Sequence, residues 1–258
     1  MISAGDFSAL IDEASGYLKS RVRRTPVEPS IGLTKALGVP VWLKLESLQL
    51  TGSFKIRGAF FRISKMRAEE RRDGVLTCSA GNHGKAMAYA ARAEDARVTI
   101  CVPKSIDRAK HEGMLAMGAD VRVSEFDGYD DTEAWARAMA MERGQAFISP
   151  FDDYAVMAAN GGTTAAETFE QVADARNFVL PVGGGGLAAG FAFEVERRLP
   201  VAKITCCQLE ASPALKMSLD AGHAITRLPA VETMAGGVEG GIGGRTFPVL
   251  QPLVDQVA

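Results

Sequence analysis

The 258-residue sequence predicts an α/β fold in which parallel sheets are flanked by helices. Short apolar runs alternate with helical patterns of about ten residues or more, an order typical of strands joined by right-handed crossovers. Several of the expected strand-to-helix turns are rich in glycine, serine or asparagine. With 47% hydrophobic and 23% charged residues, the composition is that of a globular protein.

An amphipathic helix is expected first, because apolar residues recur at helical spacing near the N-terminus. They are Phe7, Leu10, Ile11, Ala14 and Leu18. A strand over 39–45 follows, and Ser53 is expected to cap the next helix. From Gly74 the alternation becomes regular. The expected strands span 75–78, 97–102, 120–123, 146–148, 177–182 and 203–209, and the expected helices span 83–93, 107–117, 131–143, 163–173 and 187–198.

Charge and hydropathy exclude several classes of protein. The formal net charge of −2 provides no basic surface for nucleic acid or for an anionic membrane, so neither is an expected partner. Residues 177–193 carry no charge, but Pro181 and the glycines after it would break a membrane helix. The N-terminus lacks a basic stretch before an apolar one, so no secretory signal is expected.

The cysteines indicate free thiols in a cytoplasmic protein. Cys78, Cys101, Cys206 and Cys207 do not follow the spacing of a disulfide framework. Because Cys206 and Cys207 are adjacent, a strand would point them to opposite faces, and they could not bind one metal ion.

The glycine-rich turn after residue 182 predicts a phosphate site. Gly183, Gly184, Gly185 and Gly186 follow an apolar strand and, with Leu187, open a helix. Backbone N–H groups can approach an anion closely there, and the helix dipole favours negative charge. The spacing matches neither the dinucleotide motif nor the P-loop. A tight turn that only lets helix and sheet pack is the structural alternative.

A second turn, Ser79–Gly84, also lies between a strand and a helix. Its backbone donors suit a carboxylate, and the amide of Asn82 suits an oxygen on a ring. Ser79 or Asn82 could instead simply cap the helix. His83 is a poor candidate for a general base, because no motif links it to the other two histidines.

The third candidate is Lys55, within Thr51–Ala59. It lies in the first turn of a mostly apolar helix, where burial and the helix dipole both favour a neutral amine. A neutral amine can form a Schiff base with a carbonyl group. A surface lysine whose stem covers apolar residues is the structural alternative.

Together these segments resemble the threonine/serine dehydratase and serine racemase family of pyridoxal-phosphate enzymes, which has a tryptophan-synthase-β-like fold (fold type II). The resemblance covers the chain from about residue 20 onward, including Pro150–Asp153 and Thr246–Pro248. It implies pyridoxal 5′-phosphate as cofactor. It also implies a large domain of residues 1–73 and 151–258, into which a small domain of residues 74–150, carrying the Asn82 loop, is inserted.

The resemblance also implies roles for individual residues. Lys55 would hold the cofactor as a Schiff base and, once released, take the α-proton of an amino-acid substrate. The other cofactor contacts would come from Phe54, Asn82, Gly183, Gly184, Gly185, Gly186 and Leu187, and the substrate carboxylate would bind to Ser79, Gly81, Asn82 and His83. The implied reaction is β-elimination from threonine, serine or a related β-hydroxy amino acid, giving a 2-oxo acid and ammonia. A homodimer is expected of the full-length form.

The chain departs from the family pattern at three places. Ala80 stands where racemases carry a second serine, which favours elimination over racemisation, since a methyl group cannot return a proton. Relatives that bind a divalent cation use a glutamate, at the position of Glu210, and an acidic residue six positions later. Lys216 occupies that later position, and an ammonium group cannot bind a cation, so no metal is expected. Gly236 also replaces a usual acid and belongs to the third departure, toward the C-terminus.

The third departure is the ending, Leu253–Ala258, which reads as the start of another strand. Relatives continue through further elements, so the C-terminal part of the large domain is expected to be missing. The alternatives to an ammonia-lyase are therefore an amino-acid racemase of the same family and a truncated, non-catalytic homologue.

Overall fold

The computed structural model describes residues 2–229 and 231–258, and its elements surround two parallel sheets. One sheet has the order β5-β4-β3-β6. Its strands are β3 (Val75–Cys78), β4 (Val98–Val102), β5 (Asp120–Val123) and β6 (Ala146–Phe147). The other has the order β7-β8-β9. Its strands are β7 (Asn177–Pro181), β8 (Lys203–Cys207) and β9 (Gln256–Val257). All ladders in both sheets are parallel, which confirms the predicted α/β class.

The N-terminal strand pair differs from the sequence prediction. The strand expected over 39–45 is limited to β2 (Trp42–Lys44), because it pairs antiparallel only with the short strand β1 (Val27–Pro29). Pro29 ends β1, and proline lacks the N–H group that would extend a ladder. The six strands expected from Gly74 onward are confirmed, within two residues at each end.

Helices cover the sheets in the order that the periodicity predicts. The expected ones are α1 (Ala4–Leu18), α3 (Lys55–Ser64), α5 (Asn82–Ala93), α6 (Arg108–Ala116), α7 (Tyr129–Glu142), α9 (Thr163–Gln171) and α10 (Gly186–Arg198). The others are α2 (Ile31–Leu37), the 3-10 helix η1 (Glu46–Leu48), α4 (Ala68–Asp73), α8 (Tyr154–Met157), the π-helix η2 (Ala158–Gly162), α11 (Ala214–Ala221) and α12 (Thr246–Leu250). The prediction that Ser53 caps this helix is wrong, because α3 begins at Lys55 and its N-cap residue is Phe54.

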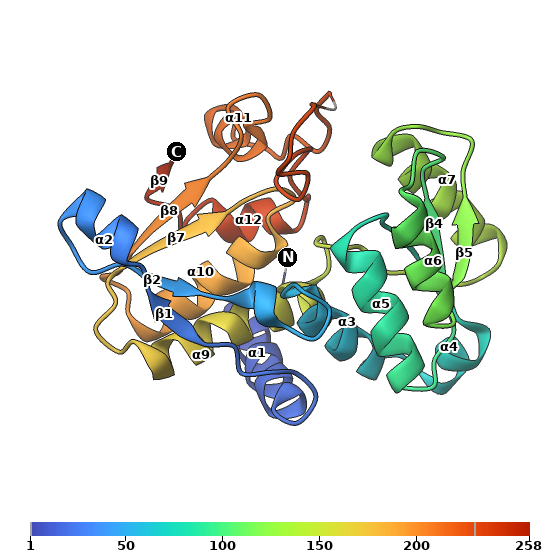
Figure 1. Ribbon diagram of the computed structural model, residues 1–258, viewed down its shortest axis with the longest axis horizontal. Coiled ribbons are helices and arrows are strands. Elements are labelled where there is room, and N and C mark those ends of the chain that lie inside the picture. The colour runs from blue at the N-terminus through green and yellow to red at the C-terminus, as the bar shows by residue number, and fades with distance from the viewer. Residues whose placement is uncertain (1, 230) are drawn as a thin grey trace.

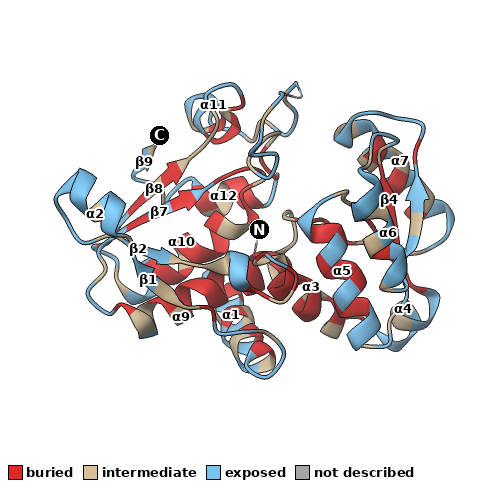
Figure 2. Cartoon of the chain, viewed as in Figure 1, coloured by how far each residue is buried: buried red, intermediate tan, exposed pale blue. Residues whose placement is uncertain are grey.

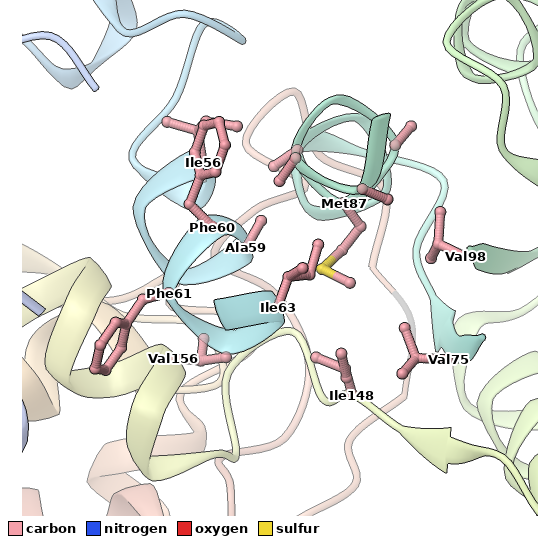
Figure 3. Close-up of a cluster of buried hydrophobic side chains, with 14 of the residues drawn as sticks. Ile56, Ala59, Phe60, Phe61, Ile63, Val75, Met87, Val98, Ile148 and Val156 are labelled. Carbon is pink, nitrogen blue, oxygen red and sulfur yellow. The ribbon is translucent and has the colours of Figure 1, made fainter. Parts of the chain in front are cut away.

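Two lobes are visible, with the four-stranded sheet in one and the three-stranded sheet in the other (Figure 1). Helices α3 and α5 lie between them, and a single hydrophobic cluster crosses from α3 to β3 and β4. Figure 3 shows Ile63 of α3 and Met87 of α5 in this cluster, with Val75 and Val98 beside them. The domain boundaries near residues 74 and 150 remain a prediction.

The π-helix η2 packs closely against α10. All five of its residues are buried, and Figure 2 shows much of α10 in the colour of buried residues. A Cβ atom on Gly190 of α10 would collide with the carbonyl oxygen of Met157, and one on Gly161 would collide with the carbonyl oxygen of Leu187. The backbones of η2 and α10 therefore approach each other at a distance that only glycine allows.

Substitution of Gly190 should have the opposite effect on stability to substitution of an exposed helical glycine. Gly190→Ala should lower the free energy of unfolding by about 1–3 kcal/mol, because the new methyl group meets backbone atoms that cannot move alone. Gly16→Ala in α1 should raise it by about 0.5–1 kcal/mol, since its Cβ would meet no atom within 4 Å. Urea unfolding measures both. Equal effects of the two substitutions would contradict the packing described for η2.

Candidate active site

Lys55 is the first residue of α3; the residue as a whole is half-buried, and its amine is the buried end. Its Nζ donates a hydrogen bond to the carbonyl oxygen of Pro150 at 2.8 Å and lies 5.4 Å from the centre of the Phe54 ring. The hydroxyl of Ser53 accepts a hydrogen bond from the Lys55 N–H at 3.3 Å. Burial lowers the pKa of Lys55 to about 8. The amine thus points inward, toward a neutral acceptor, rather than into solvent.

The glycine loop joins β7 to α10. Gly185 has a φ of 87°, a left-handed conformation that favours glycine, and α10 begins at Gly186. Side chains on Gly184 or Gly186 would collide with Phe151. Packing therefore explains why some of these positions are glycine. This agrees with the alternative of a tight turn that lets helix and sheet pack. The same conformation directs the free N–H groups of a helix N-terminus toward one place, so packing and anion binding are compatible here.

Residues 149–151 connect the amine with the glycine loop. The Pro150 carbonyl oxygen accepts the hydrogen bond from Lys55, and the next residue, Phe151, packs against Gly184 and Gly186. On the far side, the hydroxyl of Thr246 donates to the carbonyl oxygen of Gly184 at 2.8 Å. A cavity of about 440 Å³ has Ser149 among its lining residues, but Lys55, the Asn82 loop and the glycine loop do not line it.

The Asn82 loop follows β3. Gly81 is the N-cap residue of α5 and Asn82 its first residue, and both are exposed. The hydroxyl of Ser79 accepts a hydrogen bond from the Gly81 N–H at 3.2 Å, but α5 has no side-chain cap. The amide of Asn82 is therefore not used for capping. Roles toward a ligand stay predictions for Ser79, Gly81 and Asn82, as they do for Phe54 and Leu187.

His83 is buried behind this loop, with 2% of its surface exposed. Its Nε2 lies 3.1 Å from the hydroxyl of Thr77, which itself donates to the carbonyl oxygen of Ile148 at 2.7 Å. Since a hydroxyl has one proton, Thr77 must accept from His83, and the ring carries its proton on Nε2. Nδ1 has no partner. Burial and the charge of Lys55 hold the pKa of His83 well below its usual range, so the ring is neutral. A contact with substrate would have to use the His83 backbone N–H.

Arg57, which the sequence motifs do not single out as functional, fixes the first turn of α3. Its guanidinium is fully buried and donates to Glu46 of η1 and to Glu167 of α9 at 2.7–2.8 Å. Lys44 Nζ also reaches Glu167, at 2.8 Å. Although burial alone would lower the pKa of Arg57, the hydrogen bonds with both carboxylates raise it. The only indication in the sequence is a charged residue among the apolar positions Ile56, Ala59 and Phe60.

Three further observations concern metal ions, membranes and thiols. Within residues 2–229 and 231–258, no cluster of three or more His, Cys, Asp or Glu side chains is arranged to hold a metal ion. No helix of the described chain is long and apolar enough to cross a membrane. Cys78, Cys101, Cys206 and Cys207 are free, as expected.

Comparison with known proteins agrees with this geometry. Residues 18–258 match the family model described as pyridoxal-phosphate dependent enzyme. The L-threonine ammonia-lyase of Geobacter sulfurreducens is 38% identical over 96% of this chain, and the serine racemase of Arabidopsis thaliana is 34% identical over 96%. The chain spans 61% and 74% of the lengths of these relatives. The structure of a processed threonine deaminase from Solanum lycopersicum, 30% identical, superposes with a TM-score of 0.92, covering all of this chain and 70% of that one. These similarities confirm the predicted fold type.

The low pKa of the Lys55 amine should be visible in its chemical reactivity. A lysine whose pKa is lowered to about 8 is charged below that pH and neutral above it. Acetylation of Lys55 by trace acetic anhydride should therefore rise with pH to a plateau, with a midpoint near 8, followed by mass spectrometry of the Lys55 peptide. In urea-unfolded protein the midpoint should move to about 10.4. The same midpoint in the folded and unfolded chain would refute the assignment.

Proposed function

The chain belongs to the family of pyridoxal-phosphate-dependent enzymes, and on this premise we propose that it carries the site of a β-eliminating ammonia-lyase. The proposed substrate is threonine, serine or a related β-hydroxy amino acid. The observation that carries the proposal is the connection through Pro150 and Phe151, which brings a buried amine and a glycine loop to the same site. Relatives named threonine ammonia-lyase or threonine dehydratase support the choice of reaction.

The residues present fit pyridoxal 5′-phosphate. Lys55 offers an amine that is neutral above a pH of about 8, as condensation with an aldehyde requires. The N-terminus of α10, at Gly185 and Gly186, offers N–H groups and a favourable dipole for a phosphate. When bound, the cofactor supplies an aldehyde for this amine and an electron-poor ring that accepts the electrons left by a departing proton.

The remaining steps are assigned to residues of this chain. The N–H groups at the start of α5 and the amide of Asn82 bind and orient the substrate carboxylate. Lys55, once its amine is free, takes the α-proton as general base. The β-hydroxyl then leaves with a proton as water. The unsaturated amine that is released takes up one water molecule and yields a 2-oxo acid and ammonia, so the overall reaction only removes ammonia from the substrate.

A racemase is the second candidate, supported by the similarity to serine racemases. Racemisation needs a second acid–base group on the face of the substrate opposite Lys55. Ala80 carries only a methyl group, which is partly buried against the cluster around α3 and α5. Elimination is therefore the better proposal.

We also propose that the protein acts as a homodimer in a reducing, cytoplasmic compartment. The four free thiols support the compartment. Apolar side chains that α2 and β2 leave exposed support an assembly; Ile31, Leu37 and Trp42 are 84%, 64% and 47% exposed.

Replacement of Lys55 tests the proposed function directly. In protein supplied with pyridoxal 5′-phosphate, Lys55→Ala should reduce 2-oxo acid formation from a panel of β-hydroxy amino acids by at least about 10²–10⁴-fold, because nucleophile and base are both lost. The visible absorbance of the bound cofactor and its borohydride-reducible attachment should disappear. Lys65→Ala, at the other end of α3, is the matched control and should keep both. Retention of a reducible adduct at the unmodified level in Lys55→Ala would sink the assignment.

A second substitution separates elimination from racemisation. The unmodified protein should convert L-serine to the 2-oxo acid far faster than to D-serine, since only one face of the α-carbon meets an acid–base group. Ala80→Ser should raise the D-serine to 2-oxo acid ratio by about tenfold or more, within the range that one such group contributes. Chiral chromatography and an oxo-acid assay measure the two products. Equal rates of both products before substitution would favour the racemase.

A further inference from the structure

The π-helix η2 contacts both halves of the proposed cofactor site through consecutive residues. Asn160, with 1% of its surface exposed, accepts a hydrogen bond on Oδ1 from the N–H of Gly58 at 2.8 Å. Gly58 lies in the first turn of α3, three residues after Lys55. The next residue, Gly161, packs against the carbonyl of Leu187, directly after the glycine loop, and against the backbone of Phe191, about one turn further along α10.

The contact between Asn160 and α3 is close, and a second hydrogen bond supports it. A Cβ on Gly58 would lie 2.7 Å from Asn160 Oδ1, so the Asn160 side chain and the α3 backbone fit against each other without spare room. Arg57 Nη1 donates to the hydroxyl of Thr163 at 3.3 Å, and that hydroxyl donates to the Ala159 carbonyl oxygen. The turn that carries Lys55 is therefore fixed at two adjacent residues, Gly58 to η2 and Arg57 to the first residue of α9.

The chemistry of Asn160 favours a positioning role over simple filling of the core. Its Nδ2 is buried and has no hydrogen-bond partner among the residues that the structure describes, an arrangement that lowers stability. An apolar side chain would avoid this loss but could not accept the Gly58 N–H. In addition, π-helical turns inside α-helices are rare and occur often at functional sites. The Oδ1 contact with α3 is what distinguishes asparagine from the apolar residues around it.

We propose that Asn160 is a positioning residue that fixes the distance between the Lys55 amine and the Gly183–Gly186 loop. The inference rests on the cofactor of the proposed function. A ligand with an aldehyde at one end and a phosphate at the other gains from binding at both ends only if the protein holds the two sites at a matching distance. A ligand that binds at one end does not depend on this distance.

The test compares a ligand that carries both an aldehyde and a phosphate with two ligands that each carry only one of these groups. Capture of pyridoxal 5′-phosphate and of pyridoxal at Lys55 is measured from the borohydride-reduced Lys55 peptide by mass spectrometry, and inorganic phosphate is measured as a competitor of the former. Asn160→Ala should raise the half-saturating concentration of pyridoxal 5′-phosphate by about tenfold or more. The values for pyridoxal and for phosphate should change less than about twofold, because each end remains intact.

Two further variants separate positioning from stability. Thr168→Ala removes a buried side-chain hydrogen bond to the Thr164 carbonyl oxygen in α9, which contains neither Lys55 nor the glycine loop. It should leave all three values unchanged even if the melting temperature falls. Asn160→Asp keeps an oxygen for the Gly58 N–H and should restore most of the affinity for pyridoxal 5′-phosphate, which keeps the test decisive if the alanine variant does not fold.

Several results would overturn the proposal. In Asn160→Ala, an equal loss of affinity for all three ligands would do so. So would a selective loss of affinity for pyridoxal 5′-phosphate in Thr168→Ala, or no recovery of that affinity in Asn160→Asp. The last such result is an unmodified protein that binds pyridoxal 5′-phosphate no better than it binds pyridoxal or phosphate. Failure of the proposed function gives a different result, in which the cofactor is captured with the selective Asn160 effect but no 2-oxo acid forms.

Discussion

The buried charge of Arg57 is the interaction on which the larger lobe depends. A guanidinium without solvent must be matched by carboxylates, and removal of one partner from a buried ion pair costs about 3–5 kcal/mol. Its two partners lie far apart in the sequence, Glu46 before α3 and Glu167 in α9. The requirement for both therefore brings η1, α3 and α9 together before any ligand is considered.

This arrangement explains how a lysine is held away from solvent. Lys55 lies two residues before Arg57, so the ion pairs that hold Arg57 also hold the start of α3. The Lys55 side chain is then directed toward the Pro150 carbonyl oxygen, a neutral partner that does not compensate the charge of an ammonium group. Burial without an opposite charge lowers the pKa of the amine, which is the condition that reaction with an aldehyde needs.

In the glycine loop, packing alone already requires glycine at positions that are proposed to bind phosphate. Phe151 excludes side chains from Gly184 and Gly186, and its neighbour Pro150 accepts the hydrogen bond from Lys55. A larger residue in the loop would therefore push away the segment that the amine contacts. Fold and site share these atoms, and a substitution in the loop cannot change one without changing the other.

The sequence by itself determined the strand and helix order from Gly74 onward and supplied the three segments of the proposed site. Hydrophobic periodicity and glycine placement are local properties, and Lys55, Asn82 and Gly183–Gly186 each belong to such a local pattern. The short strand β1, the role of Arg57 and the π-helix at Asn160 depend on partners distant in the chain, at Lys44, Glu167 and Gly58. The orientation of the His83 ring likewise follows from a bond between Thr77 and Ile148. Only tertiary structure decides such features, because a buried polar group is defined by the partner that reaches it and not by its neighbours in the sequence.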